Sequence, residues 1–486
     1  MRADDQRVGL ACEAFFFGYP LVCAVRQIIR VAHDGLGPIG SAGFNAFAHE
    51  TDPPGPHSHF QHVSPDVLVS LAQVDLSPGP LVLHVPPTPG RYLVLELYDV
   101  WLNVFSYLGT RVTGDGGGEI LLLPPGPADG SVRAVADSPI HGDRVDGSAS
   151  GGVVEADSGV VEAYGGVVEA PSRVISVIAR FGYRGPADLP AVRALQDTLT
   201  LRPLDPGVRR PEGPPDRSKR VCDDLRFWEE LRTWMRAFPP PAAERDYARR
   251  FEALGLLTDP SPYIDPDPRL AWSLRSGLRT GRDELERLAA AGRRAHQGWI
   301  GTLHEADYNL DRFGPGVLED RHWEIPDRAQ ARIARAMAAR RPLGIVHAYE
   351  STSACCSVDA DGRHLTGAHS YLLRLPPPAV DAFWTLAMYD EPEGYLVDNA
   401  LHRYAIDSRD DLVHATDGSV PVLIQSDAPD TDAGADMGVG ADTDAATPVN
   451  WLPAAAGDFR LVLRMYLPGK EVLSGAYSLP SIHRLD

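Results

Sequence analysis

The sequence predicts an α+β protein with two β-rich, sandwich- or jelly-roll-like domains joined by a helical segment. Short apolar runs rich in β-branched and aromatic residues fill residues 60–123 and recur from Gly344 onward. Pro and Gly separate these runs, a pattern typical of antiparallel sandwiches. Between them, residues 205–300 carry apolar residues every three or four positions with interleaved charge, as amphipathic helices do. A chain of 486 residues is also too long for one core.

These patterns divide the chain into an N-terminal β-rich domain over residues 1–204, a helical connection over 205–304 and a C-terminal β-rich domain over 305–486. The apolar stretch at residues 13–33 predicts a first helix that docks on a core. Within residues 152–170 the string Gly-Val-Val-Glu-Ala occurs three times with a period of seven. Its glycines and paired valines exclude a coiled coil. We interpret the repeats as an insertion that lengthens a hairpin or loop, with a binding array as the alternative.

Composition narrows the partners and the compartment. A formal net charge of -20 repels phosphate backbones and anionic membranes, so we expect a small-molecule ligand and neither a nucleic-acid nor a membrane partner; a homodimer stays open. The uninterrupted apolar run at residues 15–25 is too short to span a bilayer and lacks a basic flank, which predicts a cytoplasmic protein. Residues 426–448 are rich in Asp, Gly and Ala and predict a disordered surface loop.

Two long parts of the chain carry strings dense in Trp, Tyr, Asn, Arg and Asp. The strings FNAFAHE and RYLVLELYDVWLNVFSYLGTRVTG in the first half, with AFWTLAMYDEPEGYLVDNALHRYAIDSRDDL and NWLPAAAGDFRLVLRMYLPGK in the second, resemble a bacterial family. That family combines domains of unknown function 1254 and 1214, and the resemblance covers residues 10–205 and 305–486. It implies a two-domain layout and no reaction. Where the family usually reads Pro-Asn-Asn-Asp-Thr-Leu-Tyr-Ser, residues 63–70 read Val-Ser-Pro-Asp-Val-Leu-Val-Ser.

Asp66 is the acid that this altered motif retains. Beside Val67 and Leu68 its carboxylate would be partly desolvated, which raises a pKa and suits general acid or base catalysis. The alternative is an aspartate that caps a turn after Pro65.

The two halves also echo each other. Residues 95–105 and 386–399 each end an apolar strand in Tyr-Asp and supply an asparagine a few residues later. Equivalent strand ends in two domains would suit a site at their interface, although polar groups at strand ends often only satisfy turns. The residues concerned are Tyr98, Asp99 and Asn103 in the first half and Tyr389, Asp390 and Asn399 in the second.

Arg111, Arg403 and Arg464 lie in the segments that resemble the family best. A guanidinium among strands usually pairs with a buried carboxylate, for which Asp99 or Asp390 would serve. The alternative is that it anchors the carboxylate or oxyanion of a ligand.

Neither a nucleotide nor a metal cofactor is predicted. The chain has no P-loop, no dinucleotide-binding glycine motif and no nucleophile elbow. His57, His59 and His62 are the nearest approach to a metal site, but the prolines before them indicate a loop and no carboxylate follows at a ligand spacing.

We therefore expect a cofactor-independent acid–base enzyme, a lyase, cyclase, isomerase or hydrolase, acting on a small organic metabolite in an interdomain cleft. High Arg, Ala, Pro and Gly usage hints at a GC-rich bacterium and specialised metabolism. The alternative is a non-catalytic binding protein or a structural, self-associating protein. The expected catalytic residues are Asp66, Tyr98 and Tyr389. The expected substrate-binding residues are Asp99, Asn103, Arg111, Asp390, Asn399, Arg403, Asn450 and Trp451, although Trp451 also suits a core position.

Overall fold

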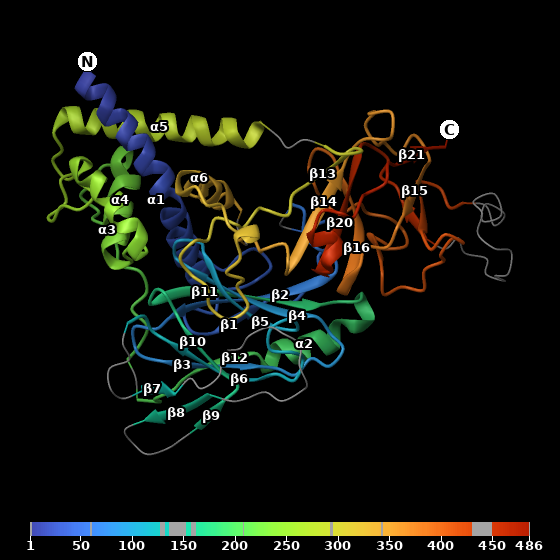
Figure 1. Ribbon diagram of the computed structural model, residues 1–486, viewed down its shortest axis with the longest axis horizontal. Coiled ribbons are helices and arrows are strands. Elements are labelled where there is room, and N and C mark those ends of the chain that lie inside the picture. The colour runs from blue at the N-terminus through green and yellow to red at the C-terminus, as the bar shows by residue number, and fades with distance from the viewer. Residues whose placement is uncertain are drawn as a thin grey trace.

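The protein consists of two β-sandwiches and a layer of helices (Figure 1). The α+β class predicted from the sequence is confirmed. The computed structural model describes residues 2–58, 61–126, 132–135, 152–156, 162–207, 209–291, 295–341, 344–429 and 450–485.

The N-terminal sandwich packs a five-stranded sheet on a four-stranded one. Along β4, Leu95 and Leu97 point into the shared core while Val94 and Tyr98 point to the opposite face, as alternation along a strand requires. That opposite face of the larger sheet is also buried. The larger sheet has the order β1 (Phe47–His49), β2 (Val67–Asp75), β11 (Val174–Gly182), β4 (Leu93–Asp99), β5 (Val104–Gly109). The smaller has the order β10 (Gly166–Glu169), β6 (Gly118–Leu123), β3 (Leu81–Val85), β12 (Thr200–Pro203).

The C-terminal sandwich is built the same way. Its larger sheet has the order β13 (Trp299–Gly301), β14 (Ser351–Cys356), β20 (Phe459–Pro468), β16 (Val380–Asp390), β17 (Ala405–Asp407). Its smaller sheet has the order β19 (Trp451–Pro453), β18 (Val420–Gln425), β15 (Tyr371–Leu375), β21 (His483–Arg484). A third, small sheet joins β7 (Val132–Val135), β8 (Gly152–Ala156) and β9 (Glu162–Tyr164).

The two sandwiches share one topology. Strands β1–β6 and β10–β12 of the first correspond in chain order and in sheet position to β13–β21 of the second. Each sandwich has a parallel neighbour at the same place, β10 with β6 and β19 with β18.

A matched pair of hydrogen bonds supports this equivalence. Leu93 N–H donates to Thr110 Oγ1 at 2.9 Å, and Trp384 N–H donates to Ser408 Oγ at 3.0 Å at the same point of the second sandwich. The strand registers then align Tyr98-Asp99 with Tyr389-Asp390, so the echo seen in the sequence reflects equivalent strand ends.

The same alignment makes Asp66 and Glu350 equivalent. Each immediately precedes a strand of the larger sheet, β2 or β14. The carbonyl of Asp66 accepts a hydrogen bond from Tyr183 N–H at 2.8 Å, and the carbonyl of Glu350 accepts one from Leu467 N–H at 3.0 Å.

Helix α1 (Arg2–Asp34) is the centre of the helical layer (Figure 1). A Cβ on Gly277 would lie 2.3 Å from the Cβ of Ala11, and one on Gly281 would lie 2.4 Å from Phe15 Cδ1, so these glycines let α5 approach α1 closely. The other helices are α2 (Leu189–Thr198), α3 (Arg226–Ala237), α4 (Arg245–Arg249), α5 (Pro268–Ala290), α6 (Arg328–Ala338) and α8 (Lys470–Leu473).

By length and composition alone, Asp5–Asp34 within α1 is long and apolar enough to cross a membrane, so the expectation of a cytoplasmic protein stays a prediction. The expectation counted only the uninterrupted apolar run and not the helix around it. In this fold the apolar side chains of α1 are largely buried, Phe15 against Phe227 of α3 and Leu21 in the same cluster.

Two features differ from the expected organisation. The helical layer is not confined to residues 205–304, because α1 and α6 also pack in it. Conversely, β13 falls within 205–304 but pairs with β14 of the C-terminal sandwich. The third Gly-Val-Val-Glu copy is β10, an integral strand with Val168 in the core, whereas β8 carries the first copy in the small sheet. Residues 157–161 of the repeats and 430–449 of the expected loop lie outside the described residues.

Candidate functional site

A cleft of about 1020 Å³ opens between the two sandwiches. This volume matches the upper end of small-molecule pockets, which commonly lie at domain interfaces. The N-terminal sandwich contributes residues 53–55, 65–66 and 183–186, and the C-terminal sandwich contributes Thr385, residues 401–407, residues 409–412 and Asn450.

Asp66 lines the cleft and forms hydrogen bonds across the domain interface. Its side chain is buried, and its two oxygens accept hydrogen bonds from the C-terminal sandwich: Thr385 Oγ1 donates to Oδ2, and Tyr466 OH donates to Oδ1 at 2.8 Å. The carboxylate therefore binds hydroxyl groups of β16 and β20 rather than the main chain of its own turn.

A chain of hydroxyl groups continues from Asp66. Tyr466 gives its only proton to Asp66, so Ser64 Oγ must be the donor in its 2.9 Å contact with Tyr466 OH. Burial raises the pKa of Tyr466 well above its ordinary value, and the charge of Asp66 raises it further. Ser64, Tyr466 and Asp66 thus form a directed hydrogen-bond chain.

Tyr389 and Arg464 hold the segment that leads to Asp66. Tyr389 OH donates to Val63 O at 2.5 Å and accepts from Arg464 Nη1 at 2.6 Å, while Arg464 Nη2 donates to His62 O at 2.9 Å. Burial raises the pKa of Tyr389 to about 12. Tyr389 lies near Asp66 but does not line the cleft. We expected Arg464 to pair with a carboxylate. That expectation was wrong, because its guanidinium donates to the phenol oxygen of Tyr389 and to the carbonyl of His62.

Glu350, the counterpart of Asp66, also lies at the domain interface and bonds to residues of the N-terminal sandwich. It is buried, and it accepts hydrogen bonds from Arg111 Nε at 2.6 Å and from Tyr92 OH at 3.2 Å. Burial raises the pKa of Glu350, against the opposing charge of Arg111. The guanidinium also lies over the rings of Tyr107 and Tyr349, 5.3 Å and 4.9 Å from their centroids. Arg111 therefore pairs with Glu350, not with Asp99 or Asp390 as expected.

A loop of the chain itself fills this second site. Gly314 N–H donates to Phe105 O at 2.8 Å, and Pro315 O accepts from Tyr107 N–H at 2.8 Å, so residues 314–316 lie along the edge of β5. Arg111 Nη2 donates to the carbonyl of the next residue, Gly316, at 2.7 Å. In the alignment of the two sandwiches, Asp407 and Arg409 of the open cleft correspond to Gly109 and Arg111. The protein thus has two equivalent interdomain sites, one open and one closed.

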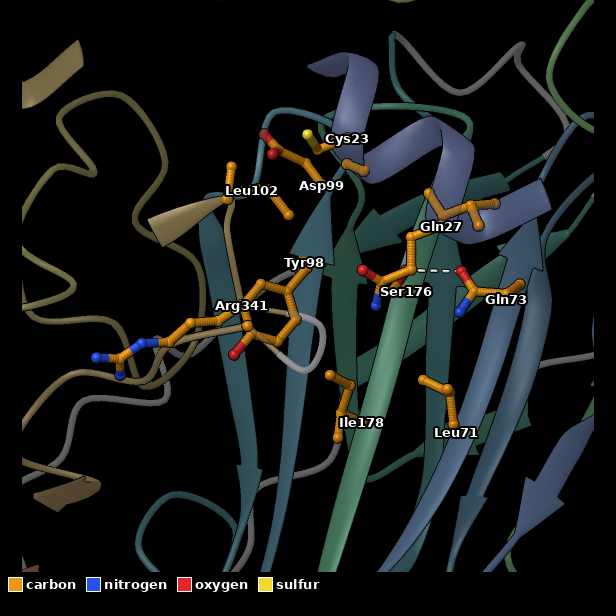
Figure 2. Close-up of a pocket in the computed structure, with 14 residues that line it drawn as sticks. Cys23, Gln27, Leu71, Gln73, Tyr98, Asp99, Leu102, Ser176, Ile178 and Arg341 are labelled. Atoms are coloured by element: carbon orange, nitrogen blue, oxygen red, sulfur yellow. Dashed lines mark hydrogen bonds between the residues drawn. The ribbon is translucent and has the colours of Figure 1, made fainter. Parts of the chain in front are cut away.

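Tyr98 and Asp99 lie at a separate, small cavity beneath α1 (Figure 2). Tyr98 OH donates to Glu96 Oε2 at 3.1 Å, and burial raises the pKa of Tyr98 well above its ordinary value. The cavity of about 30 Å³ has room for little more than a water molecule. In Figure 2, Cys23 and Gln27 of α1 cover the strands that carry Tyr98. The structure therefore does not bring Tyr98 into the cleft with Asp66.

The remaining strand-end residues satisfy turns. Asp99 accepts from the main-chain N–H of Trp101 and from Asn103 Nδ2, both within its own turn, and burial raises its pKa. Asp390 Oδ1 accepts from Tyr395 N–H at 2.6 Å. Asn399 Nδ2 donates to the carbonyls of Val397 and Arg403, at 3.2 Å and 2.8 Å.

Arg403 and Asn450 do line the cleft. Arg403 Nη1 donates to Trp451 O at 3.1 Å, and Asn450 is bonded to both main-chain groups of Val413. Trp451 is buried, and its Nε1 donates to Gln425 O at 3.0 Å, as a core residue.

The histidine string does not assemble a ligand set in the part of the chain that the structure describes. There, no three His, Cys, Asp or Glu side chains come close enough to hold a metal ion. His57 is exposed, the ring of His62 contacts Tyr389 at 5.8 Å between centroids, and His59 lies outside the described residues.

Sequence reasoning missed Thr385, Tyr466, Arg409 and Glu350. Arg464 and Tyr466 are two apart on β20 and point to the same face, so alternation along a strand would have linked them. No pattern in the sequence marks Thr385 or Glu350, because each acts through a partner more than two hundred residues away.

The fold and the cleft define a two-sandwich protein with a site between its domains. The sequence profile described as "Protein of unknown function (DUF1254)" matches residues 44–203, and the DUF1214 profile matches residues 350–470. The chain therefore belongs to the family that combines these two domains.

Two solved structures are similar to the chain to different degrees. The VPA0106 protein from Vibrio parahaemolyticus has a TM-score of 0.69 at 18% identity, over 99% of this chain and 100% of that chain. An uncharacterised protein from Burkholderia cenocepacia gives a TM-score of 0.41 at 11% identity, over 99% of this chain and 94% of that chain. At these identities the first likeness shows the fold alone. No curated protein sequence matches the chain.

Proposed function

We propose that the open interdomain cleft binds a small polar organic molecule with an anionic group. The cleft itself, formed by both sandwiches and about 1020 Å³ in volume, carries the proposal. The formal net charge of -20 also favours a small ligand over nucleic acid or an anionic membrane.

The anionic group is inferred from the state of the charged side chains. Asp66 offers a ligand little, since both of its oxygens already accept hydrogen bonds. Arg409 is bound to Asp407 and to Tyr183 O. Arg403, in contrast, uses one guanidinium N–H on Trp451 O, and its others have no hydrogen-bond partner among the described residues. A guanidinium with free N–H groups in a cleft suits a carboxylate or phosphate.

The test is a thermal-shift screen of small organic acids and phosphates against the wild-type protein, followed by titration of the hits. Arg403→Ala should weaken binding of the hits by about tenfold or more, because a charge-assisted hydrogen bond is lost. Arg279→Ala is the matched control, since Arg279 is exposed on α5 and remote from the cleft lining. If no anion binds, or if both variants bind equally, the proposal fails.

Acid–base catalysis in this cleft, without a cofactor, is the second candidate. The hydrogen-bond chain from Ser64 through Tyr466 to Asp66 favours it, because such a chain can pass a proton to a buried carboxylate. Incubating the protein with the screened hits and following them by mass spectrometry would detect turnover. Turnover carried by this chain should be lost in Ser64→Ala and in Tyr466→Phe while the affinity for the hit persists; turnover retained in both variants rules the chain out.

A further inference from the structure

The segment that occupies the closed site indicates a class of ligand for the open cleft. At the closed site, two main-chain carbonyls accept hydrogen bonds from β5 and from the residues just after it: Tyr107 N–H donates to Pro315 O, and the Arg111 side chain donates to Gly316 O. The group that occupies this site is therefore a peptide segment, and it turns at Pro315 and Gly316, where Val317 N–H donates to Gly314 O at 3.1 Å.

The open cleft presents a similar edge on β17. Tyr404 O accepts from Met388 N–H and Ser408 N–H donates to Trp384 O, so these two residues direct their main-chain groups toward β16. Alternation in an antiparallel pair then turns the main chain of Ala405 outward, to the free edge. In the alignment of the two sandwiches, Ala405 is the counterpart of Tyr107.

Ala405 N–H is available to a ligand. Asp407 N–H, the next group on this edge, donates to Asp410 Oδ2 at 3.2 Å, whereas Ala405 N–H has no acceptor within the described residues. Arg403 O, the counterpart of Phe105 O, already accepts from Asn399 Nδ2 at 2.8 Å. The edge therefore offers Ala405 N–H as a donor to a carbonyl of its ligand, whereas the carbonyl that corresponds to Phe105 O already has one partner.

We propose that the ligand of the cleft is a short peptide or peptide-like amide with a free carboxylate. One of its amide carbonyls accepts a hydrogen bond from Ala405 N–H, as Pro315 O does from Tyr107 N–H at the closed site. Its carboxylate binds Arg403, the counterpart of Phe105, so the ligand runs in the opposite direction to residues 314–316, whose Gly314 lies at Phe105 and whose Gly316 lies at Arg111. Ala405 and Arg403 are two residues apart and both line the cleft. Strand-edge recognition of this kind takes affinity from main-chain hydrogen bonds. The inference rests on the proposed anion-binding function and names its ligand class.

The probe is acetyl-Gly-Pro-Gly with a free C-terminal carboxylate, which has the sequence of residues 314–316. It is titrated by calorimetry together with a set of other N-acetylated tripeptide acids. Ala405→Pro removes the outward N–H at an edge position that tolerates proline, and Ala405→Val keeps it. We expect Ala405→Pro to weaken binding about five- to tenfold and Ala405→Val to change it less than about twofold. Amidating the peptide's carboxylate should weaken binding as Arg403→Ala does.

A peptide in which the proline carbonyl is replaced by a thioamide tests the same bond without any change to the protein. It should bind more weakly than acetyl-Gly-Pro-Gly, and equal binding would overturn the inference even if Ala405→Pro failed to fold. If small anions bind through Arg403 but no tripeptide acid does, the peptide inference fails and the proposed function stands. If neither class binds, both fail.

Discussion

Replacing Asp66 by Ala should destabilise the contact between the two sandwiches. The substitution removes the acceptor that Thr385 Oγ1 and Tyr466 OH share, and both hydroxyl groups lie in a buried interface. We therefore expect a loss of stability and no large change in either sandwich core.

The magnitude follows from the two hydroxyl groups. Thr385 Oγ1 is left without a partner, which costs about 1–3 kcal/mol, whereas Tyr466 OH can turn its proton to Ser64 Oγ. Asp66→Ala should therefore lower the free energy of unfolding by about 1–3 kcal/mol, a sizeable part of the roughly 5–15 kcal/mol that holds a typical domain folded. Asp66→Asn keeps an acceptor for Tyr466 and a partner for Thr385, so it should cost less than Asp66→Ala.

Urea unfolding followed by tryptophan fluorescence measures the loss. Asp381→Ala is the matched control: Asp381 is an exposed aspartate on β16 without a partner in the described structure, and its replacement should change stability by less than about 0.5 kcal/mol. The triple variant Asp66→Ala, Thr385→Val, Tyr466→Phe should be less destabilised than the sum of its single changes, because the three groups act as one unit. The reasoning is refuted if Asp66→Ala costs no more than Asp381→Ala, or if the three losses add.

Three further predictions concern other parts of the molecule. Burial raises the pKa of Glu50 from its ordinary 4.5 to about 7. The unfolded chain therefore loses this proton at a lower pH than the folded chain, and the free energy of unfolding falls as pH rises between those two values. Glu50→Gln should raise the free energy of unfolding by about 3 kcal/mol at pH 8 and leave it unchanged at pH 4, as measured by denaturant unfolding. Arg111→Met leaves Glu350 buried without its cation and should cost about 3–5 kcal/mol by urea unfolding, and a loss below about 1 kcal/mol would show that the carboxyl is already neutral. Gly277→Ala should destabilise the α1–α5 contact by about 1–3 kcal/mol, whereas Gly9→Ala, with open space around its Cβ position, should stabilise α1 by about 0.5–1 kcal/mol; equal melting temperatures would contradict the close helix contact.

Local patterns sufficed for the class of the fold. Alternating and fully apolar runs predicted the sandwich strands, and the 3.6-residue period predicted the connecting helices, because backbone geometry alone sets both periods. The Tyr-Asp echo between residues 95–105 and 386–399 also survived, since it records equivalent strand ends in two sandwiches of one topology.

Assignments of individual residues were less complete. Asp66 and Arg403 were expected in an interdomain cleft, and the structure places both in its lining. Tyr98 and Tyr389 carry the same local signal, yet they lie at different places, one under α1 and the other against the segment before Asp66. The Tyr-Asp string alone does not determine which element of the fold packs over the tyrosine.

The sequence by itself therefore determined the class of fold, its two β-rich halves and the acid at position 66, because those follow from local periodicity and from one retained motif. Only the tertiary structure decided what that acid does. Thr385 and Tyr466 reach Asp66 from strands more than three hundred residues away, and residues 314–316 close one of two equivalent sites while the other stays open. Such contacts depend on how the sandwiches pack against each other, and that packing depends on the summed shape of many buried side chains rather than on any local string.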